Sequence, residues 1–233
     1  MYMHPLLKKV KGGLIVSCQA LDNEPLFGSE TMKKMAMAAM MGGAVGIRAN
    51  TGADIIEMKK AGISPVIGLV KRDYPDSEIY ITPTMREVDE VVGAGADIIA
   101  FDATGRVRPN GLSLSQFVEQ IKKNHPGHLL MGDISTLEEG MFAAQLGLDM
   151  ISTTLCGYTP FTSHYESFNK ELLVELIYKT DVPVIAEGRV DTPELCAECI
   201  RLGAHAVVVG SAITRPQLIT KRFVTEMPDI KDV

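Results

Sequence analysis

The stretch PVIAEGR, from Pro183 to Arg189, predicts a short buried strand that ends in a carboxylate, a glycine and a cation. A short apolar run between proline and glycine is typical of a parallel strand that is covered on both faces. The stretch AVVVGSAITR, from Ala206 to Arg215, repeats this pattern further along the chain. Backbone N–H groups approach a phosphate closely at glycine, and a helix start adds a favourable dipole. Either turn alone is equally typical of an ordinary strand-to-helix connection, but the pair predicts a phosphate site.

One spacing recurs along the chain: at five places a threonine is followed eleven positions later by a glycine. The five pairs are Thr31 with Gly42, Thr51 with Gly62, Thr84 with Gly95, Thr136 with Gly147, and Thr192 with Gly203. Threonine is a preferred helix N-cap, and glycine suits the left-handed residue just past a helix end. Glu87 and Glu139 lie where a capping box needs an acid, and Pro193 lies at a first helical position. The spacing therefore predicts five copies of a helix followed by a buried strand.

Eight such strands are predicted along the chain, and segments of helical length such as 115–123 and 170–179 separate them. The strands begin at Leu14, Ala44, Pro65, Ile98, Leu129, Met150, Pro183 and Ala206. Alternating helices and strands indicate an α/β protein with a parallel sheet. No G-x-G-x-x-G motif follows the first strand, which favours a closed (β/α)8 TIM barrel over an open doubly wound sheet. No linker or low-complexity tract interrupts the chain, so we expect residues 1–233 to form one catalytic domain.

Composition narrows the classes of function. The chain has 233 residues and a net charge of −6, which argues against nucleic acid or an anionic membrane as the main partner. We find neither a signal peptide nor an apolar run long enough to cross a membrane, so we expect a cytoplasmic protein. The four cysteines are too scattered for a disulfide scaffold. The oligomeric state stays open, with a homodimer as one option; the methionine-rich segment 32–41 is interpreted as core filler and contact surface.

No metal site is expected either. None of the five histidines follows a predicted strand, and no H-x-x-x-H motif or paired C-x-x-C motif occurs. Cys196 and Cys199 are spaced as C-A-E-C, but they lie on the apolar side of a predicted helix without a second pair. Core packing is therefore the better interpretation of these cysteines.

Polar side chains directly follow most of the predicted strands. In chain order they are Gln19, Arg48, Lys71, Asp102, Asp133, Thr153 or Thr154, Glu187, and Gly210 with Ser211. Each one alone is compatible with an ordinary strand end. In a (β/α)8 barrel these ends meet at one mouth, where the active site lies. Two long connections, 72–83 and 157–168, leave strands at the same mouth and are candidates to shape or close it.

Lys71 is the candidate proton carrier of this mouth. Its ordinary pKa near 10.4 is too high for a base at neutral pH. Burial near Arg48 would lower the pKa, and a neutral lysine serves equally as a general base or as a Schiff-base nucleophile. A salt bridge to Asp73 or Glu187 is the alternative without chemistry. Glu187 is costly to place at the end of a buried strand, so we expect it to act as a second acid/base or to orient the substrate.

Several motifs together resemble the bacterial N-acetylmannosamine-6-phosphate 2-epimerases. They are VSCQALDNEPL from Val16, GIRAN from Gly46, GLVKRDY from Gly68, FDATGRVRP from Phe101, STTLCGYT from Ser152, AEGRVDTPE from Ala186 and VVVGSAITRP from Val207. The match runs from about Leu14 to Pro216. The resemblance implies a (β/α)8 isomerase of sialic acid and amino sugar catabolism. It would interconvert N-acetylmannosamine 6-phosphate and N-acetylglucosamine 6-phosphate without a cofactor.

The resemblance also implies a role for each residue at the mouth. Lys71 would be the acid/base at C2, with Glu187 beside it. The sugar would be held by Gln19, Arg48, Asp133 and Thr153, and the phosphate by Gly188, Gly210, Ser211 and Arg215. Arg48 or Gln19 would donate to the enolate oxygen. Whether one or two residues move the proton stays open.

Two rival functions remain from the residues themselves. The first is a Schiff-base aldolase or lyase that acts on a sugar phosphate through Lys71. The second is a non-catalytic sugar-phosphate-binding protein, which would need neither Lys71 nor Glu187 for proton transfer.

Overall fold

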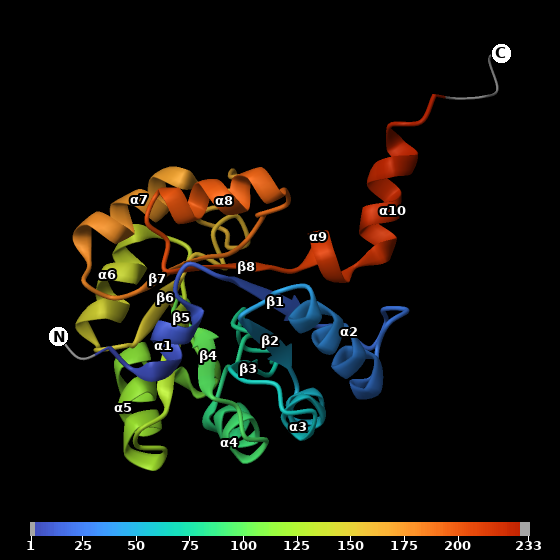
Figure 1. Ribbon diagram of the computed structural model, residues 1–233. Coiled ribbons are helices and arrows are strands. Elements are labelled where there is room, and N and C mark those ends of the chain that lie inside the picture. Colours follow the sequence, from blue (N-terminus) through green and yellow to red (C-terminus); the bar gives the residue numbers. More distant parts are fainter. Residues whose placement is uncertain (1–2, 229–233) are drawn as a thin grey trace.

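The computed structural model describes residues 3–228 and contains a closed barrel of eight parallel strands (Figure 1). The strands are β1 (Leu14–Cys18), β2 (Gly46–Asn50), β3 (Val66–Leu69), β4 (Ile98–Asp102), β5 (Leu129–Asp133), β6 (Met150–Ser152), β7 (Val184–Ala186) and β8 (Ala206–Val209). Each strand pairs with the next in sequence, and β8 returns to β1. The (β/α)8 barrel and its eight strands are thus confirmed.

An outer helix follows each of the first seven strands (Figure 1). These helices are α2 (Ser29–Met41), α3 (Gly52–Lys60), α4 (Met85–Gly93), α5 (Leu114–Asn124), α6 (Leu137–Gln145), α7 (Lys170–Lys179) and α8 (Pro193–Arg201). A one-turn 3₁₀ segment, η1 (Pro109–Gly111), precedes α5. Among the described residues no helix combines the length and the apolar character needed to cross a membrane.

The predicted helix caps are correct at four of the five threonines. The side chains of Thr51, Thr84, Thr136 and Thr192 accept the cap hydrogen bond of α3, α4, α6 and α8, with capping boxes at Glu87 and Glu139. Thr31 was expected to cap α2, and that expectation is wrong. Helix α2 begins at Ser29 after Gly28, so Thr31 lies inside its first turn. The left-handed residue after α2 is accordingly Gly43, with φ 98°, and not Gly42.

Two apolar layers hold the barrel together. Alternate strand residues such as Ile67, Ile98 and Met131 fill its interior, and the others pack outwards against the helices. The short helix α1 (Pro5–Val10) adds Leu7 and Val10 to the interior cluster. These residues join the first residues of the strands, so α1 closes the amino-terminal end of the barrel. The opposite end is left for the polar strand ends.

The chain leaves the barrel after β8. The short helix α9 (Ser211–Thr214) is followed by α10 (Pro216–Thr225), which runs away from the barrel (Figure 1). None of the α10 residues is buried. Phe223 is 73% exposed, and Leu218, Val224 and the nearby Met227 are also exposed. The helix that should complete the outer ring therefore presents an apolar surface to solvent.

Candidate active site

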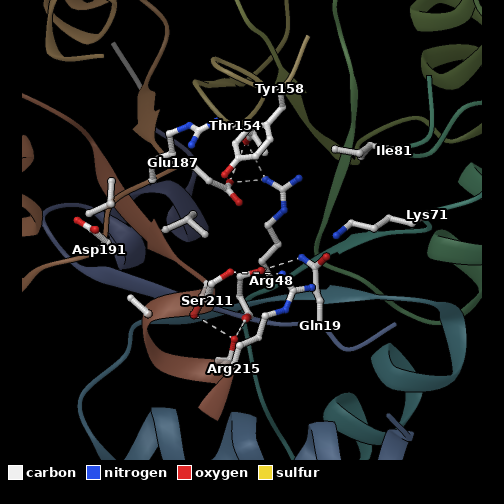
Figure 2. A pocket seen from close by; sticks show the side chains of 18 of the residues that line it. Gln19, Arg48, Lys71, Ile81, Thr154, Tyr158, Glu187, Asp191, Ser211 and Arg215 are labelled. Atoms are coloured by element: carbon white, nitrogen blue, oxygen red, sulfur yellow. Dashed lines mark hydrogen bonds and ion pairs between the residues drawn. The ribbon is translucent and has the colours of Figure 1, made fainter. Parts of the chain in front are cut away.

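A cavity of about 300 Å³ opens at the carboxyl ends of the strands (Figure 2). Eight of the predicted site residues line it: Gln19, Arg48, Lys71, Glu187, Gly188, Gly210, Ser211 and Arg215. They come from the ends of β1, β2, β3, β7 and β8 and from the turns that follow. The remaining two predicted residues, Asp133 and Thr153, lie behind this lining.

Asp133 lies beneath Arg48 in a buried charge cluster. Arg48 Nη1 lies 3.0 Å from Asp133 Oδ1, and Arg48 Nη2 donates to Asp133 Oδ2. Arg48 Nη1 also donates to Glu187 Oε2. The Arg48 side chain is 1% exposed. One cation thus holds two carboxylates, and burial makes each of these contacts stronger than it would be in water.

The end of β6 supports this cluster through two threonines with different roles. Thr154 Oγ1 donates to Asp133 Oδ1 at 2.7 Å and lines the cavity. Thr153 instead turns to the backbone of Glu187, where its Oγ1 donates to the carbonyl at 2.8 Å and accepts from the amide at 3.0 Å. Thr153 therefore fixes the position of Glu187, and Thr154 is the threonine within reach of a ligand.

Lys71 enters the cavity from the side of β3 (Figure 2). Its backbone N–H donates to Asn50 Oδ1 at 2.8 Å, which ties the end of β3 to β2. Neither alternative salt bridge, to Asp73 or to Glu187, is formed in the described part of the chain, and Glu187 pairs with Arg48. Burial lowers the pKa of Lys71 to about 8, and the charges of Arg48 and Arg215 contribute, while Glu187 and Asp133 oppose the shift. A substantial fraction of the lysine is therefore neutral near pH 8.

Glu187 is shifted in the opposite direction. Burial and the charge of Asp133 raise the pKa of Glu187, although Arg48 and the hydroxyls of Thr154 and Ser152 oppose the shift. Figure 2 shows Glu187 and Lys71 pointing into the cavity from different sides. A carboxyl with a raised pKa and an amine with a lowered pKa are suited to proton transfer near neutral pH.

Gln19 lines the cavity and carries a buried polar atom without a partner. Its Nε2 donates to Ser17 Oγ at 2.8 Å, and its Oε1 is buried without a hydrogen-bond partner in the described part of the chain. A buried amide oxygen without a partner is costly. An amide oxygen accepts hydrogen bonds, so a hydroxyl or N–H group that reached Oε1 would supply the missing partner.

The turns after β7 and β8 contribute Gly188, Gly210, Ser211 and Arg215 to the cavity. Gly188 has φ 91°, and a Cβ there would lie 3.1 Å from the Thr154 carbonyl oxygen, so the position requires glycine. Arg215 Nη1 donates to Ser211 Oγ at 3.3 Å. A cation, a hydroxyl and backbone amides together suit an anionic group.

Several cavity residues were not predicted from sequence. Tyr80 and Tyr158 come from the two long connections, and Asp191 comes from the turn after β7. Arg189, the cation that the sequence places after β7, also lines the cavity. The Arg189 guanidinium lies 4.6 Å from the centre of the Tyr158 ring and donates to the Gly157 carbonyl at 3.0 Å. The signal in the sequence was the length of the loops, but length alone does not say which residue turns inwards.

Asp102 is a strand-end residue that serves structure. Its carboxylate forms an ion pair with Arg106 and accepts from Thr104 Oγ1 at 2.7 Å, and it does not line the cavity.

Cys199 is buried in the outer core with Cys196 packed against it. Among the described residues no group of three or more His, Cys, Asp or Glu side chains is arranged to hold a metal ion.

A family model and curated relatives identify the family of this chain. The family model described as "Putative N-acetylmannosamine-6-phosphate epimerase" matches residues 32–229. A "Putative N-acetylmannosamine-6-phosphate 2-epimerase" of Clostridioides difficile is 55% identical over 219 residues, which cover 94% of this chain and 97% of the relative. A relative of the same name from Caldanaerobacter subterraneus is 54% identical over 220 residues, covering 94% and 93%.

A solved structure of the N-acetylmannosamine-6-phosphate 2-epimerase from Clostridium perfringens is also similar. It has a TM-score of 0.92 and 52% identity, and the alignment covers 97% of this chain and 98% of that one.

Proposed function

Because the chain belongs to the N-acetylmannosamine-6-phosphate epimerase family, we propose that it interconverts N-acetylmannosamine 6-phosphate and N-acetylglucosamine 6-phosphate by inverting C2. The observation that carries this proposal is the pairing of pKa shifts in one cavity. The pKa of Lys71 is lowered to about 8, and the pKa of Glu187 is raised. The relatives match over 94% of the chain, which supports one catalytic domain over residues 1–233.

The proton transfer starts from the ring-opened sugar, because only there does C2 lie next to an aldehyde. Neutral Lys71 Nζ takes the proton from C2, the electron pair of the C–H bond forms a C1=C2 double bond, and the π pair of the aldehyde moves onto its oxygen. The resulting enolate is planar at C2. Return of a proton to the opposite face of C2 restores the aldehyde and inverts the configuration. These proton-transfer steps need no cofactor.

The enolate oxygen needs a hydrogen-bond donor. Arg48 Nη1 is engaged with Asp133 and Glu187, whereas Nη2 has one N–H engaged with Asp133, which leaves a second. Gln19 Nε2 has one N–H engaged with Ser17, which leaves a second. Either residue can therefore donate to the enolate oxygen, and Arg48 also supplies positive charge.

The substrate is held at its other end by Gly188, Gly210, Ser211 and Arg215, which we assign to the phosphate. Gln19 and Thr154 line the cavity, and we assign them as contacts for the sugar. Thr153 and Asp133 act on the substrate indirectly, through Glu187 and Arg48. Binding energy from the remote phosphate then holds the open chain for reaction at C2.

We place this reaction in cytoplasmic sialic acid and amino sugar catabolism, as the family membership supports.

We also propose a homodimer. In a (β/α)8 barrel an outer helix follows each strand, but α10 leaves the barrel with its apolar side chains exposed. Reciprocal insertion of α10 into a second copy would complete both outer rings.

Incubation with N-acetylmannosamine 6-phosphate in D₂O, followed by proton NMR, tests the activity. We expect the N-acetylglucosamine 6-phosphate signals to appear with deuterium at C2. Borohydride added during turnover should leave no increase in the mass of the protein. A trapped adduct on Lys71 would instead support an aldolase or lyase, and binding without exchange would support a sugar-phosphate sensor.

A further inference from the structure

An ion pair outside the cavity holds the arginine of the phosphate end. Arg215 Nε lies 2.7 Å from Glu24 Oε1, and Arg215 Nη2 lies 2.9 Å from Glu24 Oε2. Glu24 belongs to the connection between β1 and α2, 191 positions away in sequence. The carboxylate meets the guanidinium side-on with two parallel hydrogen bonds. These two bonds fix both the position and the plane of the guanidinium.

This pairing leaves one nitrogen of Arg215 for the cavity. Nε and Nη2 are engaged with Glu24, and Nη1 donates to Ser211 Oγ at 3.3 Å. Arg215 and Ser211 both line the cavity, whereas Glu24 does not. The carboxylate therefore lies behind the arginine and turns its remaining N–H groups towards a ligand.

Glu24 is itself firmly held. Its Oε2 accepts from the Leu21 backbone N–H at 2.9 Å, and its Oε1 accepts from Gln217 Nε2 at 3.1 Å. These donors come from its own loop and from the start of α10. A carboxylate that blocked the anion site and moved away on binding would face the cavity and have fewer fixed partners. The contacts favour a fixed support instead.

From this geometry we propose that Glu24 is a positioning residue for recognition of the phosphate. It orients Arg215 so that Nη1 and the Ser211 hydroxyl meet the phosphate together, and it thereby selects the phosphorylated sugar over the neutral one. The inference rests on the proposed function, since it assigns the source of phosphate specificity at that same site.

Steady-state kinetics of Glu24→Ala and Glu24→Gln test this role. We expect KM for N-acetylmannosamine 6-phosphate to rise about tenfold while kcat stays within about threefold, because a misaligned charge-assisted contact weakens binding and not proton transfer. With unphosphorylated N-acetylmannosamine, kcat/KM should be the same in parent and variants. Glu24→Gln keeps the shape of the side chain and guards against misfolding of the alanine variant.

Two controls separate positioning from general structure. Asp22→Ala removes an exposed carboxylate from the same connection and should leave KM unchanged. In the double variant Glu24→Ala with Arg215→Ala, KM should be no higher than in Arg215→Ala alone, since the carboxylate acts only through the arginine.

A lower KM in Glu24→Ala would mean that the carboxylate competes with phosphate, and it would overturn the inference. An equal fall in kcat/KM for the phosphorylated and the unphosphorylated sugar would overturn it as well. So would additive increases in KM in the double variant. An unchanged KM in Glu24→Ala beside a raised KM in Arg215→Ala would overturn this inference alone. An unchanged KM in Arg215→Ala would remove the phosphate assignment and this inference with it.

Discussion

The Arg48 guanidinium and the Asp133 carboxylate lie side by side at the barrel mouth, with Nη1 3.0 Å from Oδ1 and Nη2 on Oδ2. The two residues end β2 and β5, and neither side chain reaches solvent appreciably. Because Arg48 also holds Glu187, the charges of this pair act on the pKa of Glu187, the candidate acid/base.

Loss of Asp133 should therefore cost stability. In Asp133→Asn the Arg48 cation loses its main partner in a buried site, and we expect the free energy of unfolding to fall by roughly 3–5 kcal/mol. Urea unfolding measures the change. Replacing the whole cluster, as in Arg48→Met with Asp133→Leu and Glu187→Leu, should cost less than the single change, because no buried charge is then left without a partner. A larger loss in the triple variant would contradict this account.

Lys71→Ala should abolish epimerisation while the phosphosugar still binds. Losing a general acid/base costs on the order of 10²–10⁴ in rate, and the phosphate contacts lie elsewhere in the cavity. NMR gives the turnover, and calorimetry with N-acetylglucosamine 6-phosphate gives the affinity. Lys60→Ala, on the exposed face of α3, is the matched control. Turnover of Lys71→Ala within a few-fold of the parent would rule out the assignment.

The rate should depend on pH through Lys71. The amine accepts a proton only when it is neutral, and its pKa is about 8. Below that pH we expect kcat/KM to fall about tenfold per pH unit, as for a single essential base. Arg215 contributes to lowering the pKa, so Arg215→Ala should move this limb to higher pH. A limb that stays in place or moves to lower pH would contradict this role for Arg215.

Glu187→Gln separates two schemes for moving the proton. The amide keeps the shape of the side chain but cannot accept a proton. If Glu187 is a second acid/base, C2–H exchange in D₂O should persist from one epimer while epimerisation stops. If Lys71 is the main proton carrier and Glu187 assists it, exchange and epimerisation should fall by a similar factor. We expect the second result, and NMR of both epimers measures both rates.

Phe223→Glu should disrupt the homodimer. Phe223 is 73% exposed on α10, and a charge there would oppose burial of this surface against a second copy. Light scattering coupled to size exclusion gives the mass of the parent and the variant. Tyr178→Glu on α7, at 87% exposure, is a control that should stay dimeric. A monomeric parent would contradict the proposed dimer.

Much of the fold follows from local sequence. The caps at Thr84 and Thr136 involve only residues within one helical turn, so their spacing alone predicts them. Thr31 looked like the same signal but lies inside α2, because Gly28 turns the chain earlier. Lys71 and Glu187 could be predicted because strand ends of a parallel barrel must meet at one mouth.

What only the tertiary structure decided depends on contacts between distant segments. The choice of Thr154 over Thr153 as cavity lining depends on how the end of β6 turns towards β7. The pairing of Arg215 with Glu24 joins residues 191 positions apart, and no spacing in the sequence encodes it. Arg48 can meet both Asp133 and Glu187 only once the barrel has closed, since the three residues come from different strands and turns. Strand and cap patterns are local and periodic, whereas the charge, protonation and orientation of these side chains are set by neighbours that barrel closure brings together.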